Sequence, residues 1–387
     1  MRQLLILLIF GLIGINAPAH NHTQAQASEI TRLCPAVGIQ QRGPDQYGPG
    51  GIVLTYFDKD SLWVYNVTTN NRYPLPETAP CGSNCNPSRD ARWITYLDAQ
   101  TRTFGKMRFD GTQRTPLVRY ASEVAWWTED TLLVWTPTQD AYLRPEAGEG
   151  TEPLNVDGII SVQPGGRWGL LLEQREDDFV RLLVDLESRD LSWAAEPTFL
   201  AIDQPYFNTS QWSPDGTWLA FTAPTTFDEG AQSVGTELFG IRPGDAEPTQ
   251  WTDLFSIYGA TRVNGQAPSE LSWSPDGSKI AFWVAEMLGP NPAANAGNAL
   301  IHILDVETGA ITLYCGFSTT EHTPNPPRLI WSPDSTHLVF GANLPNDTRG
   351  YILLGLNTAD GIFTELSVGV YPALGNADAV AWGLPPQ

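Results

Sequence analysis

A short phrase recurs three times in the second half of the chain. It reads Trp-Ser-Pro-Asp, followed by a small turn residue and a strand-like run, and its copies begin at Trp212, Trp273 and Trp331. Their spacing of roughly 60 residues is that of a repeated supersecondary unit, not of a coiled coil. Such a repeat restricts the chain to architectures in which similar units stand side by side and bury a shared core.

Each copy has the chemistry of a tight β-hairpin. Proline presets φ at the start of the turn, aspartate bonds to the backbone that follows it, and glycine accepts a positive φ, as at Gly216 and Gly277. Apolar and polar residues alternate on both sides of the turn. We therefore predict a structural role in packing and turn formation for Trp212, Asp215, Trp273, Asp276, Trp331, Asp334 and Trp382.

Weaker copies extend the repeat toward the N-terminus, at Ser88–Trp93, Trp127–Leu132 and Gln163–Trp168. Each hairpin is followed by further short strand-like runs, such as Ile301–Val306. Four antiparallel strands per repeat are typical of a β-propeller blade. The sequence therefore predicts an all-β chain, with a seven-bladed β-propeller over residues 51–387. Six blades are the alternative, because the third repeat, Trp127–Leu154, is weakly patterned.

The two ends of the repeat region complement each other. Residues Gly51–Leu75 contain three strand-like runs and lack a first one, whereas Asp378–Trp382 is a first run with nothing after it. We expect the C-terminal strand to complete the N-terminal blade and thereby to close the ring.

The repeated phrase resembles the repeat of TolB-type propellers, which also occurs in the propellers of the prolyl oligopeptidase and dipeptidyl peptidase families. The similarity covers about residues 51–383. TolB carries an α/β domain before its propeller, for which residues 28–50 are too few, and the peptidases carry a catalytic hydrolase domain, whose Gly-x-Ser-x-Gly motif does not occur in this chain. The resemblance implies a TolB-like propeller standing alone.

The N-terminus has the pattern of an export signal. Arg2 precedes an apolar run from Leu4 to Ile15, which is too short to cross a hydrocarbon core of about 30 Å. Small residues suited to cleavage follow at Ala17–Ala19 and Ala25–Ala27. We predict a signal peptide over residues 1–27 and an N-terminal extension over residues 28–50. The mature protein is then periplasmic or extracellular and spans no membrane.

Four cysteines follow the predicted signal peptide: Cys34, Cys81, Cys85 and Cys315. Export permits disulfides, and we expect one or two bridges, one of which would tie the Cys34 segment to the Cys81/Cys85 loop. The sequence leaves all three full pairings open. A zinc site at Cys81 and Cys85 is disfavoured because no second pair of ligands lies at a suitable spacing nearby.

The loops of a propeller divide between two faces. If the strands of a blade are named A to D in chain order, the A–B and C–D turns share one face and the B–C and D–A loops share the other. The Pro-Asp-Gly turns are all A–B turns, and we call their face the turn face. The long insertions, at 224–236, 252–269, 286–299 and 316–326, fall on the opposite, insertion face. Variable loops on a rigid scaffold commonly bind partners.

The distribution of acidic residues also indicates the insertion face as a binding surface. The chain has 22 Lys and Arg against 43 Asp and Glu, a net charge of −21, which excludes a basic nucleic-acid footprint. We predict a binding site for a cationic or mixed partner on the insertion face, where the carboxylates also suit a divalent cation such as Ca²⁺. The alternative interpretation is that they only keep the protein soluble. The candidate residues are Asp58, Asp60, Asp98, Glu176, Asp177, Asp178, Asp228 and Glu229, with Phe227, Phe255, Tyr258 and Met287 as apolar anchors.

The predicted function is that of an exported, monomeric, non-enzymatic scaffold that binds a protein, with a cell-envelope glycan as a further ligand class and no other cofactor. The alternatives are a propeller enzyme acting on polysaccharide, either a lyase or a hydrolase, and an accessory subunit of an envelope complex. A catalytic histidine would have to lie in a loop at the channel mouth. Of the histidines after the signal segment, His322 meets that condition, whereas His302 and His337 fall in predicted strands.

Overall fold

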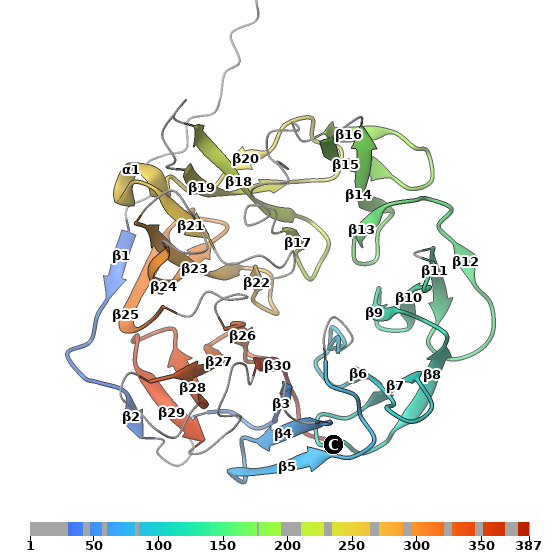
Figure 1. Ribbon diagram of the computed structural model, residues 1–387, viewed down its shortest axis with the longest axis horizontal. Helices are drawn as coiled ribbons and strands as arrows, with labels where there is room; N and C mark the ends of the chain where they lie inside the picture. The colour runs from blue at the N-terminus through green and yellow to red at the C-terminus, as the bar shows by residue number, and fades with distance from the viewer. Residues whose placement is uncertain are drawn as a thin grey trace, which may run out of the picture.

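The computed structural model describes residues 30–41, 47–55, 60–81, 85–138, 140–175, 178–194, 210–227, 234–263, 271–288, 296–320, 327–344, 351–367 and 378–386. The predicted signal peptide and His322 lie outside these residues. Seven small sheets stand around a central axis and form a closed ring (Figure 1). The predicted seven-bladed propeller is confirmed, and the six-bladed alternative is wrong.

The ring closes as the sequence predicts. Strand β30 (Asp378–Gly383) pairs antiparallel with β3 (Gly51–Thr55), with Val53 opposite Ala381. Strands β4 (Leu62–Asn66) and β5 (Asn71–Leu75) complete this first blade. The first and last strands of the propeller are therefore neighbours in one sheet, in which β30 covers the edge of β3.

Blades 2 to 4 follow in chain order. Blade 2 comprises β6 (Ile94–Leu97), β7 (Thr103–Met107) and β8 (Thr115–Arg119). Blade 3 comprises β9 (Glu123–Trp126), β10 (Thr131–Trp135), β11 (Ala141–Pro145) and β12 (Glu152–Pro153). Blade 4 comprises β13 (Ile159–Val162), β14 (Trp168–Arg175), β15 (Asp178–Asp185) and β16 (Leu191–Ala194). The weakly patterned third repeat thus forms a complete four-stranded blade.

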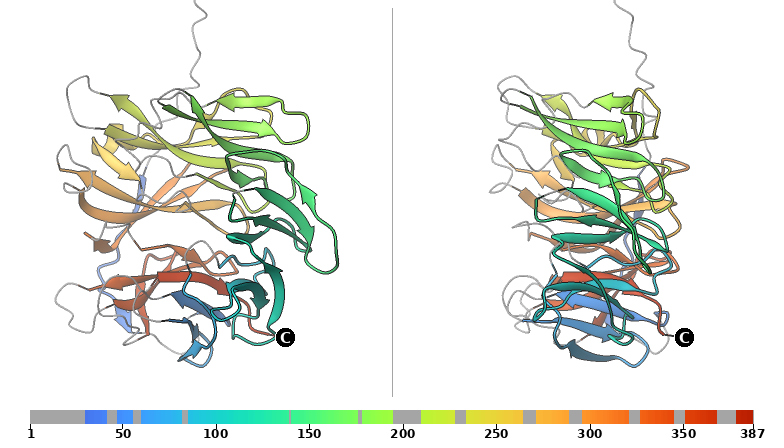
Figure 2. Two further views of the ribbon diagram at one scale, coloured as in Figure 1. Left: turned by 45° about the vertical axis from the view of Figure 1, so that its right-hand side comes forward. Right: turned by 90° about the vertical axis from the view of Figure 1, so that its right-hand side faces the viewer.

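Blades 5 to 7 contain the three strong copies of the phrase. Blade 5 comprises β17 (Ser210–Trp212), β18 (Leu219–Phe227), β19 (Val234–Ile241) and β20 (Thr249–Gln250). Blade 6 comprises β22 (Ser272–Trp273), β23 (Lys279–Met287), β24 (Ala296–Asp305) and β25 (Ile311–Thr319). Blade 7 comprises β26 (Ile330–Trp331), β27 (His337–Asn343), β28 (Tyr351–Asn357) and β29 (Phe363–Ser367). Seen edge-on, the strands run between the two faces of the disc, so the hairpin turns gather on those faces (Figure 2).

Several segments predicted to be loops are regular structure. The D–A insertion contains helix α1 (Leu254–Tyr258) and strand β21 (Thr261–Val263), which pairs with β23. The buried carboxylate of Glu237 accepts hydrogen bonds from the backbone N–H groups of Leu254 and Phe255, at 2.8 Å each. This cap for the helix start comes from a neighbouring strand, so local sequence does not reveal it. The B–C insertions are also shorter than predicted, because β18, β19, β23 and β24 extend into them.

The N-terminal extension binds the outside of the ring. Strand β1 (Ile30–Leu33) pairs parallel with β25 of blade 6, and β2 (Gln40–Gln41) pairs parallel with β29 of blade 7. Cys34 forms a disulfide with Cys315 of β25, and Cys81 forms one with Cys85. The predicted link from Cys34 to the Cys81/Cys85 loop is therefore wrong. The pairing of β1 with blade 6 carries Cys34 to that blade instead.

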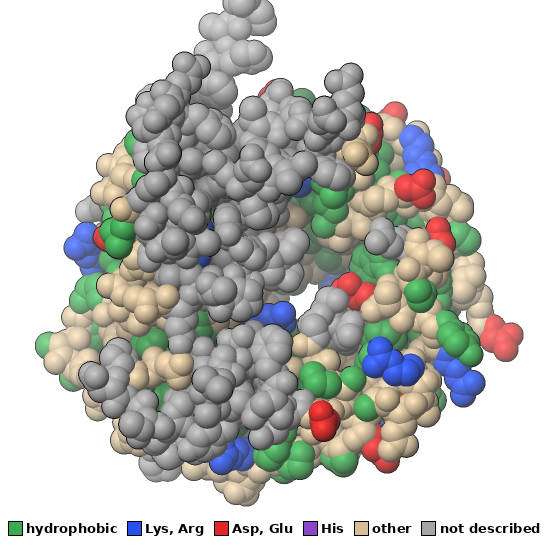
Figure 3. All heavy atoms as spheres, in the orientation of Figure 1, with side chains coloured by type: hydrophobic (Ala, Val, Ile, Leu, Met, Phe, Trp, Pro, Cys, Tyr) green, Lys and Arg blue, Asp and Glu red, His purple; other side chains and the backbone are tan. Residues whose placement is uncertain are grey.

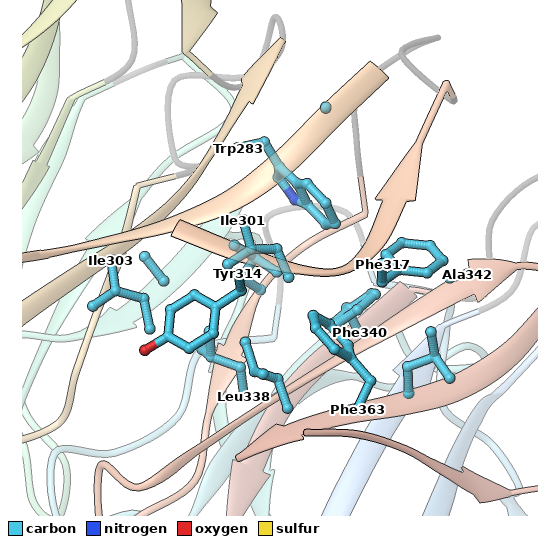
Figure 4. Close-up of a cluster of buried hydrophobic side chains, with 14 of the residues drawn as sticks. Trp283, Ile301, Ile303, Tyr314, Phe317, Leu338, Phe340, Ala342 and Phe363 are labelled. Carbon is cyan, nitrogen blue, oxygen red and sulfur yellow. The ribbon is translucent and has the colours of Figure 1, made fainter. Parts of the chain in front are cut away.

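The hydrophobic core is divided among the gaps between neighbouring blades. Between blades 6 and 7, Phe317 and Phe340 lie with ring centroids 5.3 Å apart, and Trp283 meets Phe340 edge to face at 5.6 Å (Figure 4). Aromatic rings prefer such tilted and edge-to-face arrangements. The indole Nε1 of Trp283 donates to the carbonyl of Pro327 at 2.8 Å, which satisfies the one polar atom of this buried ring. The blades therefore form one rigid support for the loops on both faces.

Candidate functional site

A groove of about 1060 Å³ lies between blades 5 and 6 on the turn face. Its walls come from the A–B turns of both blades, from residues on either side of the C–D connection of blade 5, and from the C–D turn of blade 6. Thr31 of β1 also lines it. The side chains that bear on its chemistry are Asp215, Trp218, Arg242, Trp251, Asp276 and Glu307.

The two A–B turns hold carboxylates at the groove. Asp215 accepts hydrogen bonds from Ser213 Oγ at 2.6 Å and from the Thr217 N–H at 3.0 Å. Asp276 is held in the same way by the turn of blade 6. Partial burial raises the pKa of both carboxyls, but these hydrogen bonds outweigh it and hold each pKa below its ordinary value. Both groups are therefore ionised at neutral pH.

Aromatic rings form the groove wall between the turns. Trp251 lies edge to face with Trp218, with centroids 5.2 Å apart, and with Trp273, at 6.2 Å. The ring of Trp251 covers Gly240 so closely that a Cβ at that position would lie 1.9 Å from its Cζ2. Trp218 and Trp251 are only half-buried, whereas Trp273 belongs to the buried core. Two indole rings therefore face the groove from a fixed support.

One cation already occupies an aromatic face in this groove. The guanidinium carbon of Arg242 lies 4.2 Å from the ring centroid of Trp218. Arg242 itself is exposed, and so is Glu307 in the turn of blade 6. The groove thus offers indole faces, three carboxylates and one guanidinium. This arrangement can bind a cationic side chain by cation–π and charge interactions.

The sequence-predicted acidic site is only partly described. Asp58, Glu176, Asp177, Asp228 and Glu229 lie outside the described residues, and of Asp178, Phe227 and Met287 only the backbone is described, at strand ends. Asp60 is exposed just before β4. Asp98 follows β6, and its carboxylate accepts hydrogen bonds from the N–H groups of Gln100 and Thr101, so it stabilises a turn. The Thr101 hydrogen bond is the main cause of a lowered pKa for Asp98.

Phe255 and Tyr258 both lie in α1, and Tyr258 turns toward the core. Its hydroxyl lies 3.0 Å from Nε2 of His302, and its ring packs against the buried cluster between blades 5 and 6. Burial raises the pKa of Tyr258. His302 is itself buried, which lowers its pKa to about 4 and keeps the imidazole neutral at pH 7. Tyr258 therefore anchors α1 to blade 6.

Charges of both signs are interspersed on the described part of the face drawn in Figure 3, around the central opening of the ring. Among the described residues, no three His, Cys, Asp or Glu side chains are grouped so that they could hold a metal ion. Nor does the described part of the chain contain a helix that is long and apolar enough to cross a membrane.

The groove was not predicted from the sequence. Trp218 occupies a recurring position after the turn, which was a usable signal for that residue. Arg242 and Trp251 of blade 5 and Glu307 of blade 6 belong to no motif. Glu307 joins the other two only because blades 5 and 6 are neighbours in the ring.

Comparison with known proteins supports the fold. No protein-family model and no curated protein matches the chain. Among solved structures it is similar to TolB from Acinetobacter baumannii, with 16% identity, a TM-score of 0.44 and coverage of 87% of this chain and 82% of that one. It is also similar to an oligogalacturonate lyase from Vibrio parahaemolyticus, with 12% identity, a TM-score of 0.50 and coverage of 84% and 88%. Both structures are less than 25% identical to this chain, so the similarity is one of fold.

Proposed function

We propose that this chain is a non-enzymatic propeller scaffold that acts outside the cytoplasm and holds a segment of a partner protein in the groove between blades 5 and 6. The observation that carries the proposal is the pair of half-buried indole rings flanked by carboxylates on both blades. Location outside the cytoplasm rests on the signal pattern of residues 1–27.

The groove favours a segment that carries Lys or Arg. Asp215 and Asp276 are kept ionised by their turns, and Glu307 adds an exposed carboxylate beside them. Indole faces attract cations through the ring quadrupole, and Arg242 over Trp218 is an internal example of that contact. The strongly acidic chain would also speed the approach of a basic partner.

The turn hydrogen bonds support a binding role for these carboxylates. A carboxylate that accepts two or more hydrogen bonds and has a lowered pKa is a weak proton acceptor and holds no proton to donate at neutral pH. Asp215 and Asp276 both meet this description. Their chemistry suits electrostatic attraction better than general acid–base catalysis. The polysaccharide enzyme and the envelope-complex subunit stay alternative hypotheses.

A defined peptide tests the proposal. We expect an octapeptide of alternating Lys and Gly to bind the full chain measurably by isothermal titration, and its Glu–Gly counterpart to bind more weakly. Glu307→Lys should weaken binding of the Lys peptide about three- to tenfold, because it reverses one groove charge. Arg242→Gln should strengthen it, because it removes a like charge and uncovers the ring of Trp218.

The matched control is Glu149→Lys, which makes the same charge change at an exposed site in the C–D turn of blade 3. Its affinity for the Lys peptide should stay within about twofold of the wild type. Equal weakening by Glu149→Lys and Glu307→Lys would mean that net charge, and not the groove, attracts the peptide. Weaker binding by Arg242→Gln would also contradict the proposal.

A further inference from the structure

The interface between blades 4 and 5 departs from the repeat. In blades 6 and 7, Trp273 and Trp331 each donate their indole N–H to a backbone carbonyl in the first strand of the preceding blade, at 3.2 and 2.8 Å. Trp212 is the equivalent residue of blade 5. Its buried Nε1 finds no acceptor among the described residues. Among the described residues this bond between blades is therefore missing at Trp212, as it also is at Trp382 of blade 1.

The preceding blade shows a matching irregularity. Its first strand, β13, shifts register against β14 between Ile159 and Ser161. The hydroxyl of Ser161 is buried and has no hydrogen-bond partner in the described part of the chain. Ser161 pairs with Leu170, which lies in the cluster packed against blade 5 together with Trp212 and Phe221. A buried hydroxyl and a buried indole N–H thus border the same interface.

The third departure is a buried cation. Arg181 of β15 is 2% exposed, and its Nε and both Nη atoms lack an acceptor among the described residues. Its guanidinium lies 5.5 Å from the ring centroid of Phe221 across the interface. Burial lowers its pKa to about 10, so it stays protonated at neutral pH.

A protonated guanidinium in this position is strongly unfavourable unless something compensates it. The loss of hydration of a buried charge exceeds what one aromatic contact returns. All three unsatisfied groups can donate: the five N–H bonds of Arg181, the indole N–H of Trp212 and the hydroxyl of Ser161. Donors that border an interface with a buried positive charge are complementary to an anion, and guanidinium matches two-oxygen groups in particular.

We propose that Arg181 binds a small anion, a carboxylate or an inorganic oxyanion, between blades 4 and 5. Trp212 and Ser161 border the interface that receives it. The anion supplies a negative charge beside Arg181, for which the described residues provide no acceptor. It also links blades 4 and 5, between which the indole–carbonyl bond of Trp212 is missing. The proposal is independent of the groove between blades 5 and 6.

Thermal unfolding of the full chain tests this site. Sodium acetate and sodium phosphate are titrated separately, each against sodium chloride at equal ionic strength. For the wild type we expect a saturable rise in Tm of about 2–4 °C with one of the two anions. Arg181→Met should lose this rise. It should also unfold at an equal or higher Tm than the wild type in the absence of the anion, because an apolar side chain replaces an uncompensated charge.

Two further variants keep the test decisive. Arg119→Met makes the same change at an exposed arginine of β8 and should keep the full anion response. Arg181→Lys keeps the positive charge but loses the planar, two-pronged donor geometry of the guanidinium. The anion concentration that gives half of the Tm rise should therefore increase at least about tenfold. If Arg181→Met does not fold, the result for Arg181→Lys tests the proposal in its place. The absence of a saturable rise in the wild type overturns the proposal. So does an unchanged anion response in Arg181→Met or Arg181→Lys.

Discussion

The serine and aspartate of the repeated phrase form one small hydrogen-bonded unit. Ser213 Oγ donates to Asp215 at 2.6 Å and accepts from the Trp218 N–H at 3.0 Å. The same two bonds recur at Ser274, Ser332 and the weaker copy at Ser88. The aspartate is thereby oriented to accept the backbone N–H two residues on. This geometry explains why the phrase marks a hairpin wherever it occurs.

His302 makes the stability of the fold depend on pH. Burial lowers its pKa from 6.5 to about 4, so the folded chain resists protonation that the unfolded chain accepts. The stabilisation from the neutral imidazole is fully present above pH 6.5 and is lost as the pH falls toward 4. We expect about 2–3 kcal/mol of the unfolding free energy to be lost through this residue between pH 7 and pH 4.5. Urea unfolding at both pH values measures the loss.

His302→Gln isolates this contribution. The carboxylates with lowered pKa values, such as Asp215, also lose stability on acidification, but they do so equally in both proteins and cancel in the comparison. The variant should therefore show the smaller drop in unfolding free energy between pH 7 and pH 4.5. Identical drops in the two proteins would contradict the assignment.

At the scale of elements, the N-terminal extension fastens two blades to the start of the propeller. Strand β1 pairs with blade 6 and β2 with blade 7, and Gln41 Nε2 donates to Glu365 at 3.1 Å. Further along the chain, the ring of Tyr47 packs directly on the backbone of Gly355. A Cβ added to Gly355 would lie only 2.6 Å from this ring, so the contact requires glycine. The Tyr47 centroid is 4.6 Å from that of His337. A segment with little pattern of its own thus becomes part of the core.

The two disulfides should differ in their effect on stability. The Cys34–Cys315 bridge joins residues 281 apart, whereas Cys81–Cys85 joins residues 4 apart. A bridge that closes a long loop removes more entropy from the unfolded chain. We expect Cys34→Ser with Cys315→Ser to lower the unfolding free energy by about 2–5 kcal/mol, as measured by urea unfolding.

Cys81→Ser with Cys85→Ser is the matched control, since it makes the same chemical change in a short loop. Its loss should be clearly smaller than that of the first pair. A loss at Cys81 and Cys85 as large as that at Cys34 and Cys315 would show that loop length is not the deciding factor.

For the whole molecule, closure of the ring depends on one strand from the C-terminus. Strand β30 pairs with β3, and its residues Ala379 and Trp382 are buried with the first and seventh blades. Without β30, blade 1 would expose both the edge of β3 and an apolar face. An exposed apolar edge strand favours association between molecules.

Deletion of residues 378–387 should therefore make the protein aggregate, or unfold over a broader temperature range than the full chain does. Size-exclusion chromatography and thermal unfolding measure both properties. Deletion of residues 385–387, which lie beyond β30, is the control and should leave both properties unchanged. A cooperative, monomeric product from the longer deletion would show that ring closure by β30 is dispensable.

The sequence alone was enough to predict the all-β class, the seven blades and the closure of the ring. These features follow from local chemistry: Pro and Asp at the turns, alternation in the strands, and a repeat that needs neighbours to bury its apolar faces. The partner of Cys34, the helix capped by Glu237, the groove beside Trp251 and the buried charge of Arg181 could not be predicted in this way. Each depends on residues from separate elements of the chain, and only the packed ring decides which distant side chains become neighbours.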